Sequence, residues 1–244
     1  MPNGGPASHH NPGRFVVLNA GMLLRMRTIA AGAVLALLVC AAPASARIIE
    51  IGGTASQAAP TCPATPCQAV SRTTGYQAKV LKSRATYIVP ADGRIVAWTI
   101  NLGAPDKRQT DFFNGNFGEA SAGVTILRRA KHLYHRVVGQ TPIEKLAPYF
   151  GTRVQFPLTT SIAVKKGQVV ALTVPTWAPA LTQLLNDGSS WRASRPKGKC
   201  DKTTVQTAQT KMGQRVQYRC LYRARLTYSA TLITNPKAPT KPKT

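Results

Sequence analysis

The chain has 244 residues, and its 32 Lys and Arg residues outnumber eight Asp and Glu residues to give a net charge of +24 at pH 7. A charge of this size favours a polyanionic partner or polyanionic surroundings, and a solvated alkaline surface with no particular partner is the alternative. The small number of carboxylates argues against a glycosidase-type site, which needs a positioned pair of them.

The first 46 residues have the pattern of an upstream extension followed by a secretory signal peptide. Arg25 and Arg27 form a short basic segment, residues 29–42 form an apolar run, and the run Ala44-Ser45-Ala46 has the small residues of a cleavage site. The apolar run is short for a membrane anchor, which needs about 20 residues. Cleavage after Ala46 leaves 198 residues with 29 basic and eight acidic side chains, a net charge of +21. That length suits one domain with a sizeable core.

Four cysteines remain after cleavage: Cys62, Cys67, Cys200 and Cys220. An even number in an exported chain indicates two disulfides. Three pairings are possible, and we expect the local one, Cys62–Cys67 with Cys200–Cys220. The second bond would close a loop of about twenty residues and stabilise the fold by about 3 kcal/mol on the chain-entropy model. The alternative is a zinc site, but these spacings without a nearby histidine do not match the usual ligand patterns.

Short β-rich runs between turn residues recur along the mature chain and predict a series of strands. The expected strands are 47–51, 76–81, 85–89, 94–102, 123–128, 133–138, 153–158, 161–164 and 168–174. The run 94–102 has few polar residues on either face, so we expect a central strand with Trp98 in the core. We expect short helical turns at 142–150 and 181–185, loops at 103–119 and 186–199, and an irregular segment around Trp177 between two prolines. Residues 203–210 alternate weakly, and we expect them to pair with the final strand through a turn at 211–214.

The expected loop at 103–119 contains four oxygen-bearing side chains close together in sequence: Asp111, Asn114, Asn116 and Glu119. Calcium prefers such oxygens, and loops of β-sandwiches hold it. The spacing does not match an EF-hand, and Asn-Gly is in the first place a turn signal. Calcium at Asp111–Glu119 therefore stays an open alternative, and we expect no cofactor.

The most regular pattern lies at residues 217–232. Every second residue from Tyr218 to Leu232 is aromatic, apolar or cysteine, and most of the intervening residues are arginine or carry a hydroxyl. This is the period of a half-buried β-strand. Sixteen residues would span about 50 Å, so we expect a bend or bulge within the stretch. Residues 235–244 are rich in Pro and Lys, and we expect a disordered tail there.

About ten short strands with little helix predict an all-β fold built as a single domain at 47–234, an antiparallel two-sheet β-sandwich or a barrel, and we expect the sandwich. The segment 161–174, SIAVKKGQVVALTV, resembles the strand–turn–strand of jelly-roll-type sandwiches such as galactose-binding-like and CUB-like modules. The resemblance covers these fourteen residues only. It implies binding of glycans or proteins through loops at one end of the sandwich.

Signals of catalysis are few in the mature chain. Its only histidines are His132 and His135, and no G-x-S-x-G motif is present to place a nucleophilic serine. On a strand, an odd offset puts the two imidazoles on opposite faces, so they do not form a metal pair. We expect a protein without enzymatic activity, and a hydrolase of envelope glycans or esters is the alternative.

Basic and aromatic residues near the C-terminus form the candidate binding site. The Cys200–Cys220 bond would bring the basic loop at 192–199 alongside the arginines of the last strand. Guanidinium groups suit bidentate contact with phosphate or carboxylate, and an exposed indole stacks on sugars or bases. The expected anion contacts are Arg192, Arg195, Arg219, Arg223 and Arg225, and the expected stacking platforms are Trp177 and Trp191. The alternatives are a solvated strand face for the arginines and a loop lid over the core for each tryptophan.

Taken together, these patterns predict a secreted or extracellular protein, free or retained at the cell envelope, that binds anionic envelope or matrix polymers of glycan or polyphosphate type. A structural extracellular protein with no specific ligand is a further alternative. The charge permits contact with a membrane surface, and no recognised nucleic-acid-binding motif is present. The sequence does not indicate an oligomeric state.

Overall fold

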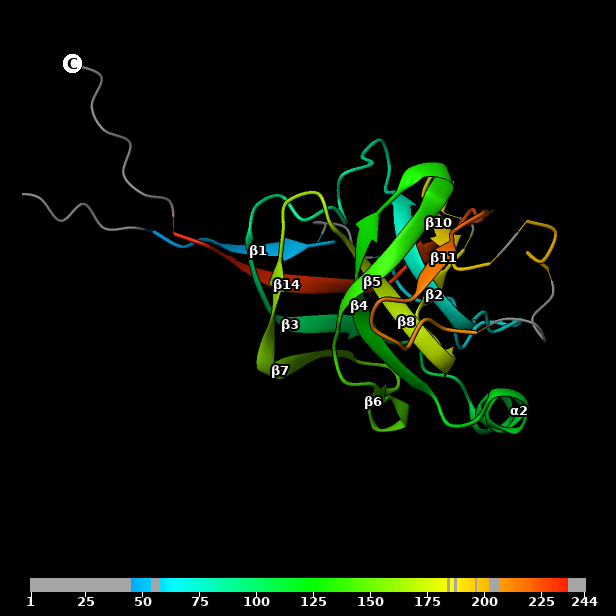
Figure 1. Ribbon diagram of the computed structural model, residues 1–244. Coiled ribbons are helices and arrows are strands. Elements are labelled where there is room, and N and C mark those ends of the chain that lie inside the picture. The colour runs from blue at the N-terminus through cyan, green and yellow to red at the C-terminus, as the bar shows by residue number, and fades with distance from the viewer. Residues whose placement is uncertain are drawn as a thin grey trace, which may run out of the picture. The chain divides into compact units, whose positions relative to one another are not determined.

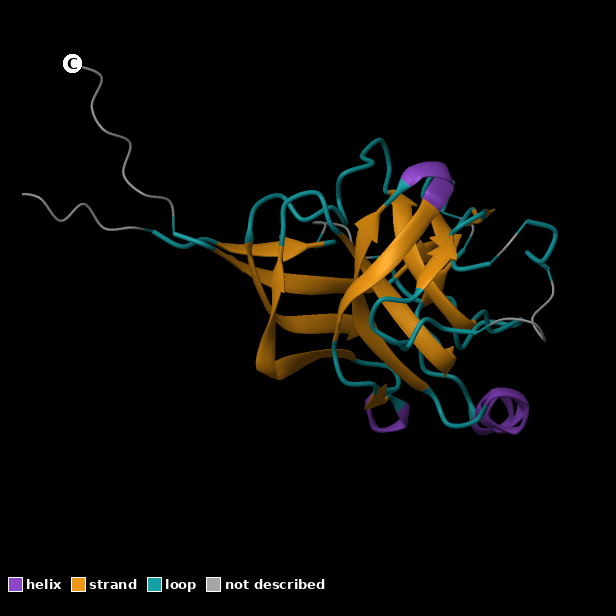
Figure 2. Cartoon of the chain, in the orientation of Figure 1, coloured by secondary structure: helices purple, strands orange, loops and turns teal. Residues whose placement is uncertain are grey.

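The computed structural model describes residues 45–53, 58–183, 185–186, 188–195, 197–201 and 207–236. These residues form fourteen strands, one α-helix and two short 3-10 helices (Figures 1 and 2). Every ladder is antiparallel, which confirms the expected all-β antiparallel class. The described residues all belong to one compact unit, Ser45–Ala238. The expected signal segment up to residue 44 and the tail from residue 237 lie outside them.

The smaller of the two main sheets has four strands in the order β1-β14-β3-β7 (Figure 1). Their bounds are Ile48–Ile51 for β1, Tyr228–Thr234 for β14, Gly93–Asn101 for β3 and Arg153–Val164 for β7. The expected central strand is β3, which has a neighbour on each side, and its Trp98 is fully buried as predicted. The expected strands at 153–158 and 161–164 are one continuous strand, β7.

The larger sheet has the order β11-β5-β4-β8-β2-β10-β12, and the two-residue strand β6 also pairs with β4. The bounds are Arg215–Gln217 (β11), Tyr134–Gln140 (β5), Ser121–Arg129 (β4), Val169–Ala178 (β8), Val70–Lys79 (β2), Ser190–Ala193 (β10), Cys220–Tyr222 (β12) and Glu144–Lys145 (β6). A separate two-stranded ladder joins β9 (Leu181–Thr182) to β13 (Arg225–Leu226).

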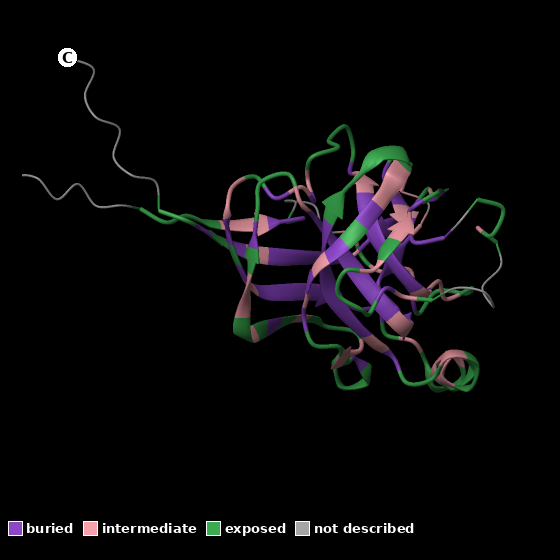
Figure 3. Cartoon of the chain, viewed as in Figure 1, coloured by how far each residue is buried: buried purple, intermediate pink, exposed green. Residues whose placement is uncertain are grey.

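One hydrophobic core joins the inner faces of the two sheets. It contains Trp98 and Ile100 from β3, Leu172 from β8, Trp191 from β10 and Ala230 from β14, among others. Figure 3 shows the buried segments along these strands and the exposed turns around them. The segment that resembles jelly-roll modules crosses between the sheets, because β7 belongs to the smaller sheet and β8 to the larger one.

A second buried layer covers the outer face of the larger sheet. Tyr76, Leu127, Val137, Val169, Ala171 and Tyr218 form this smaller apolar cluster. Beside it, hydroxyl groups form a buried row in which Thr173 Oγ1 contacts Thr74 Oγ1 at 3.0 Å and Thr125 Oγ1 at 2.5 Å. The segment 207–218 lies over this face, since the backbone N–H of Gln209 donates to Thr74 Oγ1 at 2.8 Å and the Tyr218 hydroxyl donates to Gln209 Oε1.

The alternating stretch 217–232 has the expected break. It is divided into β12, β13 and β14, which pair with β10, with β9, and with β1 and β3 respectively. The aromatic and apolar residues of its inward face are buried as predicted, apart from Tyr222, which is half-buried. The chain therefore uses this stretch to pass from the larger sheet to the smaller one.

The prediction of a loop at 103–119 is wrong for most of its length, because residues Lys107–Phe117 form the α-helix α2. Asp106 caps its first turn, with Oδ1 accepting from the N–H of Gln109 at 2.7 Å, and Gln109 Oε1 accepts in return from the N–H of Asp106 at 3.0 Å. This reciprocal capping box satisfies two donors that a helix start leaves unpaired. Phe113 and Phe117 on the helix pack against the core.

Prolines and tertiary pairing account for the other differences in secondary structure. The segment around Trp177 is part of β8, since a register irregularity between Ser71 and Thr73 of β2 accommodates Pro175 without loss of the ladder. In the helical turn expected at 181–185, Leu181–Thr182 form strand β9, and the loop expected at 186–199 contains strand β10. The segment 85–89 forms no strand and makes an isolated bridge from Ile88 to Val169. In the stretch 203–210, residues 203–206 lie outside the described residues and residues 207–210 form no strand, and the strand after the turn, β11, pairs with β5. A 3-10 turn at Ala147–Tyr149 lies within the helical turn expected at 142–150.

Both expected disulfides, Cys62–Cys67 and Cys200–Cys220, are present. Two disulfides indicate an oxidising environment outside the cytosol. In the described part of the chain, no helix combines the length and the apolar character of a membrane-crossing segment.

Candidate functional site

Trp177 does not lie on the surface, so its predicted role as a stacking platform is wrong. Its side chain is fully buried beneath α2, with the ring of Phe113 stacked on it at a centroid distance of 4.6 Å. Its indole Nε1–H donates to Asn114 Oδ1 at 2.9 Å. Because β8 continues past Pro175, Trp177 points into the core and serves packing.

Trp191 is also buried, with 4% of its surface exposed. It lies on β10 and stacks on Tyr222 of the neighbouring strand β12 at a centroid distance of 4.8 Å. The prediction of an exposed indole fails here because the expected loop contains a strand whose alternate residues face the core.

Arg195 is 7% exposed and acts inside the protein. Its Nη1 donates to the carbonyl of Cys200 at 3.3 Å and to the hydroxyl of Tyr222, and its Nη2 donates to the carbonyl of Ser71 at 3.3 Å. Its guanidinium carbon lies 5.3 Å from the centroid of the Tyr222 ring. These contacts join β2, β12 and the disulfide loop, so the prediction of Arg195 as an anion contact is wrong.

Arg225 is 5% exposed, although it shares the strand parity of the exposed Arg219 and Arg223. It lies on β13, opposite Thr182 of β9. The stretch has left the larger sheet at this point, so the side that is open at β12 is covered at β13. Arg225 is therefore not a surface contact.

Of the predicted arginines, Arg219 and Arg223 are exposed and Arg192 is half-buried. The Cys200–Cys220 bond does bring the loop at 197–201 beside β12. The Nη1 group of Arg192 donates to the carbonyl of Arg219 at 3.2 Å. Arg192 lies on the outer face of the larger sheet, where it pairs with Tyr76 of β2 and Leu221 of β12.

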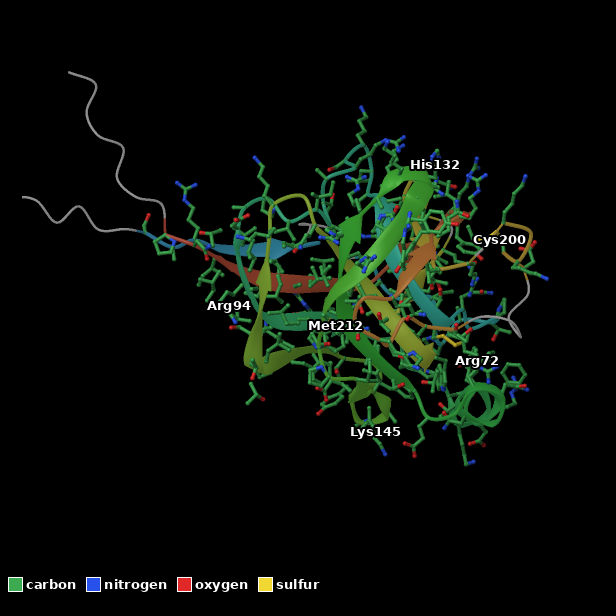
Figure 4. The ribbon with its side chains drawn as sticks, viewed as in Figure 1. Arg72, Arg94, His132, Lys145, Cys200 and Met212 are labelled. Atoms are coloured by element: carbon green, nitrogen blue, oxygen red, sulfur yellow. A yellow bond between two sulfur atoms is a disulfide. The ribbon has the colours of Figure 1, made fainter. Side chains whose placement is uncertain are left out.

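Arg192 opens onto a cleft that we call the arginine cleft, with a volume of about 210 Å³. Three arginines line it from distant parts of the sequence: Arg84 before the bridge at Ile88, Arg129 at the end of β4, and Arg192 on β10. The other lining residues are Tyr76, Gln77, Ala78, Tyr87, Ile88, Leu133 and Val169. Figure 4 labels His132 at the nearby tip of the β4–β5 hairpin, where side chains ending in nitrogen gather.

Among the described residues, no carboxylate lines the arginine cleft. The three ion pairs of the described residues lie elsewhere, at Lys107–Asp111, Lys145–Glu119 and Lys165–Asp92. Burial raises the pKa of Tyr76, and this outweighs the opposite effect of the positive charges of Arg192 and Arg129. The phenol therefore stays neutral at pH 7, and the cleft has positive charge only.

A buried aromatic cluster supports the wall of the cleft. The ring of His135 lies 5.0 Å from that of Tyr76 and 4.9 Å from that of Tyr218. The pKa of His135 is lowered to about 4, mainly by burial; the hydrogen bond from Nδ1–H to the carbonyl of Leu133 raises it, and the positive charges of Arg129 and Arg192 add to the lowering. The neutral imidazole holds Tyr76 in place without adding charge, which keeps the cleft preorganised.

Two of the three cleft arginines were missed by the sequence analysis. Arg129 ends β4 beside a basic turn that is visible in the sequence, but nothing in the sequence connects it to Arg84 or to Arg192. The three come together because β2 lies between β8 and β10, while β4 pairs with the other edge of β8. Strand order is a property of the tertiary fold.

The oxygen-rich stretch 111–119 has local roles in the structure. Asp111 pairs with Lys107 along α2 at 2.6 Å, and Asn114 accepts from Trp177. Across the described residues, no three His, Cys, Asp or Glu side chains are grouped in a way that could hold a metal ion. His132 lies in the exposed turn and His135 is buried, so the two imidazoles have separate environments.

Comparison of the chain with protein-family models, with curated proteins and with solved structures finds no match.

Proposed function

We propose that the mature chain is a secreted, non-catalytic protein that binds an anionic polymer of the cell envelope or extracellular matrix through the arginine cleft. The observation that carries this proposal is the convergence of Arg84, Arg129 and Arg192 on one cleft to which no described residue contributes a carboxylate. Three like charges repel one another, and an anion bound between them is attracted to all three, which offsets that repulsion. Phosphate and carboxylate groups match the planar donors of guanidinium.

The state of the arginine side chains supports the same proposal. Arg84 and Arg129 are exposed, and no hydrogen bond or ion pair to another described residue holds either guanidinium. Arg192 is anchored through backbone carbonyls, which leaves its positive charge uncompensated. The two disulfides and the signal-like segment at 1–46 support export to a compartment where such polymers are found.

Co-sedimentation with purified envelope polymers, and with long-chain inorganic polyphosphate as a defined polyanion, tests the proposal over a salt series. The informative variant is Arg84→Gln/Arg129→Gln, because it removes two positive charges without breaking an internal hydrogen bond. A matched control is Arg108→Gln/Arg153→Gln, which removes the same charge from exposed positions on α2 and β7.

We expect saturable binding by the wild type that weakens as salt rises, because binding a polyanion releases its counterions. The cleft variant should bind more weakly, and the slope of log affinity against log salt should fall by about 2, close to one unit for each lost contact. The control should keep the wild-type slope apart from a small general effect of charge. Equal loss in both variants would place the binding in net charge alone, and absence of saturable binding at low salt would refute the proposal.

A further inference from the structure

Three arginines lie in direct register across the three strands at one end of the larger sheet. Arg128 of β4 pairs with Arg136 of β5, and Arg136 pairs in turn with Arg215 of β11. Directly paired residues point to the same side of a sheet, so the three side chains form a row, which we call the arginine ladder. All three are exposed, and β11 is an edge strand, so the row is open at one end.

The arginine ladder is electrostatically unfavourable in the protein alone. Side chains that oppose each other on neighbouring strands have Cβ atoms about 5 Å apart, and like charges in such pairs destabilise the sheet. Neither β4, β5, β11 nor the hairpin turn between β4 and β5 contains an Asp or Glu to separate the charges. The guanidinium carbon of Arg215 lies 4.7 Å from the ring centroid of Tyr134, which holds that end of the row in place.

The arginine ladder and the arginine cleft lie on opposite faces of the same hairpin. Successive residues of a strand point to opposite sides, so Arg128 faces away from its neighbour Arg129, which lines the cleft. The pairing confirms the assignment: Arg129 is opposite His135, which is buried beside Tyr76 on the cleft side, whereas Arg128 is opposite the exposed Arg136. A polymer chain bound in the arginine cleft therefore leaves the arginine ladder accessible on the other face.

We propose that the arginine ladder is a second binding site for a repeating polyanion, so that one molecule holds two polymer chains and cross-links them. This inference rests on the proposed function for the first site and adds a second site with a separate role. A row of cations about 5 Å apart takes ligands with several neighbouring anionic groups, because each guanidinium needs its own counter-charge. Polyphosphates and closely sulfated or phosphorylated polymers have this chemistry.

A two-step capture assay tests the inference with full mature protein. Protein is first loaded on beads that carry immobilised long-chain polyphosphate, and after washing the beads are offered fluorescently labelled polyphosphate. The first step measures binding and the second measures bridging. The ladder variant is Arg128→Gln/Arg136→Gln/Arg215→Gln. Its matched control is Arg47→Gln/Arg108→Gln/Arg153→Gln, which removes three exposed charges from the residue before β1, from α2 and from β7 respectively.

We expect the wild type and the control to capture labelled polymer. The ladder variant should stay on the beads through the cleft while its capture of labelled polymer falls at least about tenfold, because the second site is needed for a second chain. A ladder variant that captures as much as the control would overturn the inference, as would a wild type that binds the beads and captures nothing. Failure of the wild type to bind the beads at all is a different result, since it refutes the proposed function itself.

Discussion

Replacement of Arg195 by alanine tests whether this arginine stabilises the fold or binds the ligand. Its guanidinium donates to the carbonyls of Cys200 and Ser71, both at 3.3 Å, and to the hydroxyl of Tyr222, whose ring it also covers. A hydrogen bond from a charged donor contributes about 1.5–3 kcal/mol and an enclosed cation–π contact about 1–2 kcal/mol. Removal of the side chain also relieves the cost of a buried charge that pairs with no described carboxylate, which offsets part of the loss. We therefore expect the free energy of unfolding to fall by about 3 kcal/mol.

Urea unfolding followed by tryptophan fluorescence measures this change, since all three tryptophans are buried. The midpoint should fall while the slope with urea stays constant, and the melting temperature should fall by roughly 6–12 °C for a domain of this size. The exposed Arg219 provides the reference, with Arg219→Ala expected within about 0.5 kcal/mol of wild type. Below the unfolding transition, Arg195→Ala should keep wild-type affinity for polyphosphate. A stable Arg195→Ala protein with lost polymer binding would refute this reasoning and restore Arg195 as a ligand contact.

Three further predictions concern the stability of the fold. Cys200→Ser/Cys220→Ser opens a loop with a sequence separation of 20, and chemical denaturation should show a loss of about 3 kcal/mol on the chain-entropy model; an unchanged midpoint would contradict it. Trp177→Ala removes a fully buried ring and its bond to Asn114, so it should cost about 3–5 kcal/mol, and a loss below about 1 kcal/mol would mean that the ring is not part of the core. The lowered pKa of His135, about 4 against 6.5, means that between these values the unfolded chain binds a proton that the folded protein does not. The free energy of unfolding should therefore decline as pH falls from 6.5 to 4, by about 3 kcal/mol, and a His135→Phe variant should lose this part of the pH dependence; equal pH profiles for the two proteins would exclude His135 as the cause.

The strand class and the cysteine pairing were accessible from the sequence because both depend on local patterns. Alternation at 217–232 predicted which residues face inward, and Tyr218, Cys220 and Leu226 are buried as expected. An even set of cysteines with short separations, in a chain expected to be exported, favoured the local pairing among three, and the structure has that pairing. The helix α2 had a local signal too, the Asp106–Gln109 capping box, which the glycines and asparagines of the same stretch obscured.

The candidate site was predicted only in part, because exposure depends on what covers a strand. Arg219 and Arg225 have the same parity in one alternating stretch, yet Arg219 is exposed and Arg225 is buried where the chain changes sheet. Trp177 and Trp191 were expected in open segments because nearby prolines and glycines suggested loops. Pairing of β8 with β2 and of β10 with both β2 and β12 outweighs these local preferences and turns both indoles inward.

The sequence by itself determined an all-β chain with a large positive charge and two local disulfides, since periodicity, composition and cysteine spacing are local or additive properties. Only the tertiary structure decided which positive charges act together. The order of strands in the larger sheet brings Arg84, Arg129 and Arg192 into one cleft, and the register between β4, β5 and β11 aligns Arg128, Arg136 and Arg215. Neither grouping follows from spacing along the chain, because pairing between distant strands is set by burial of their shared apolar faces.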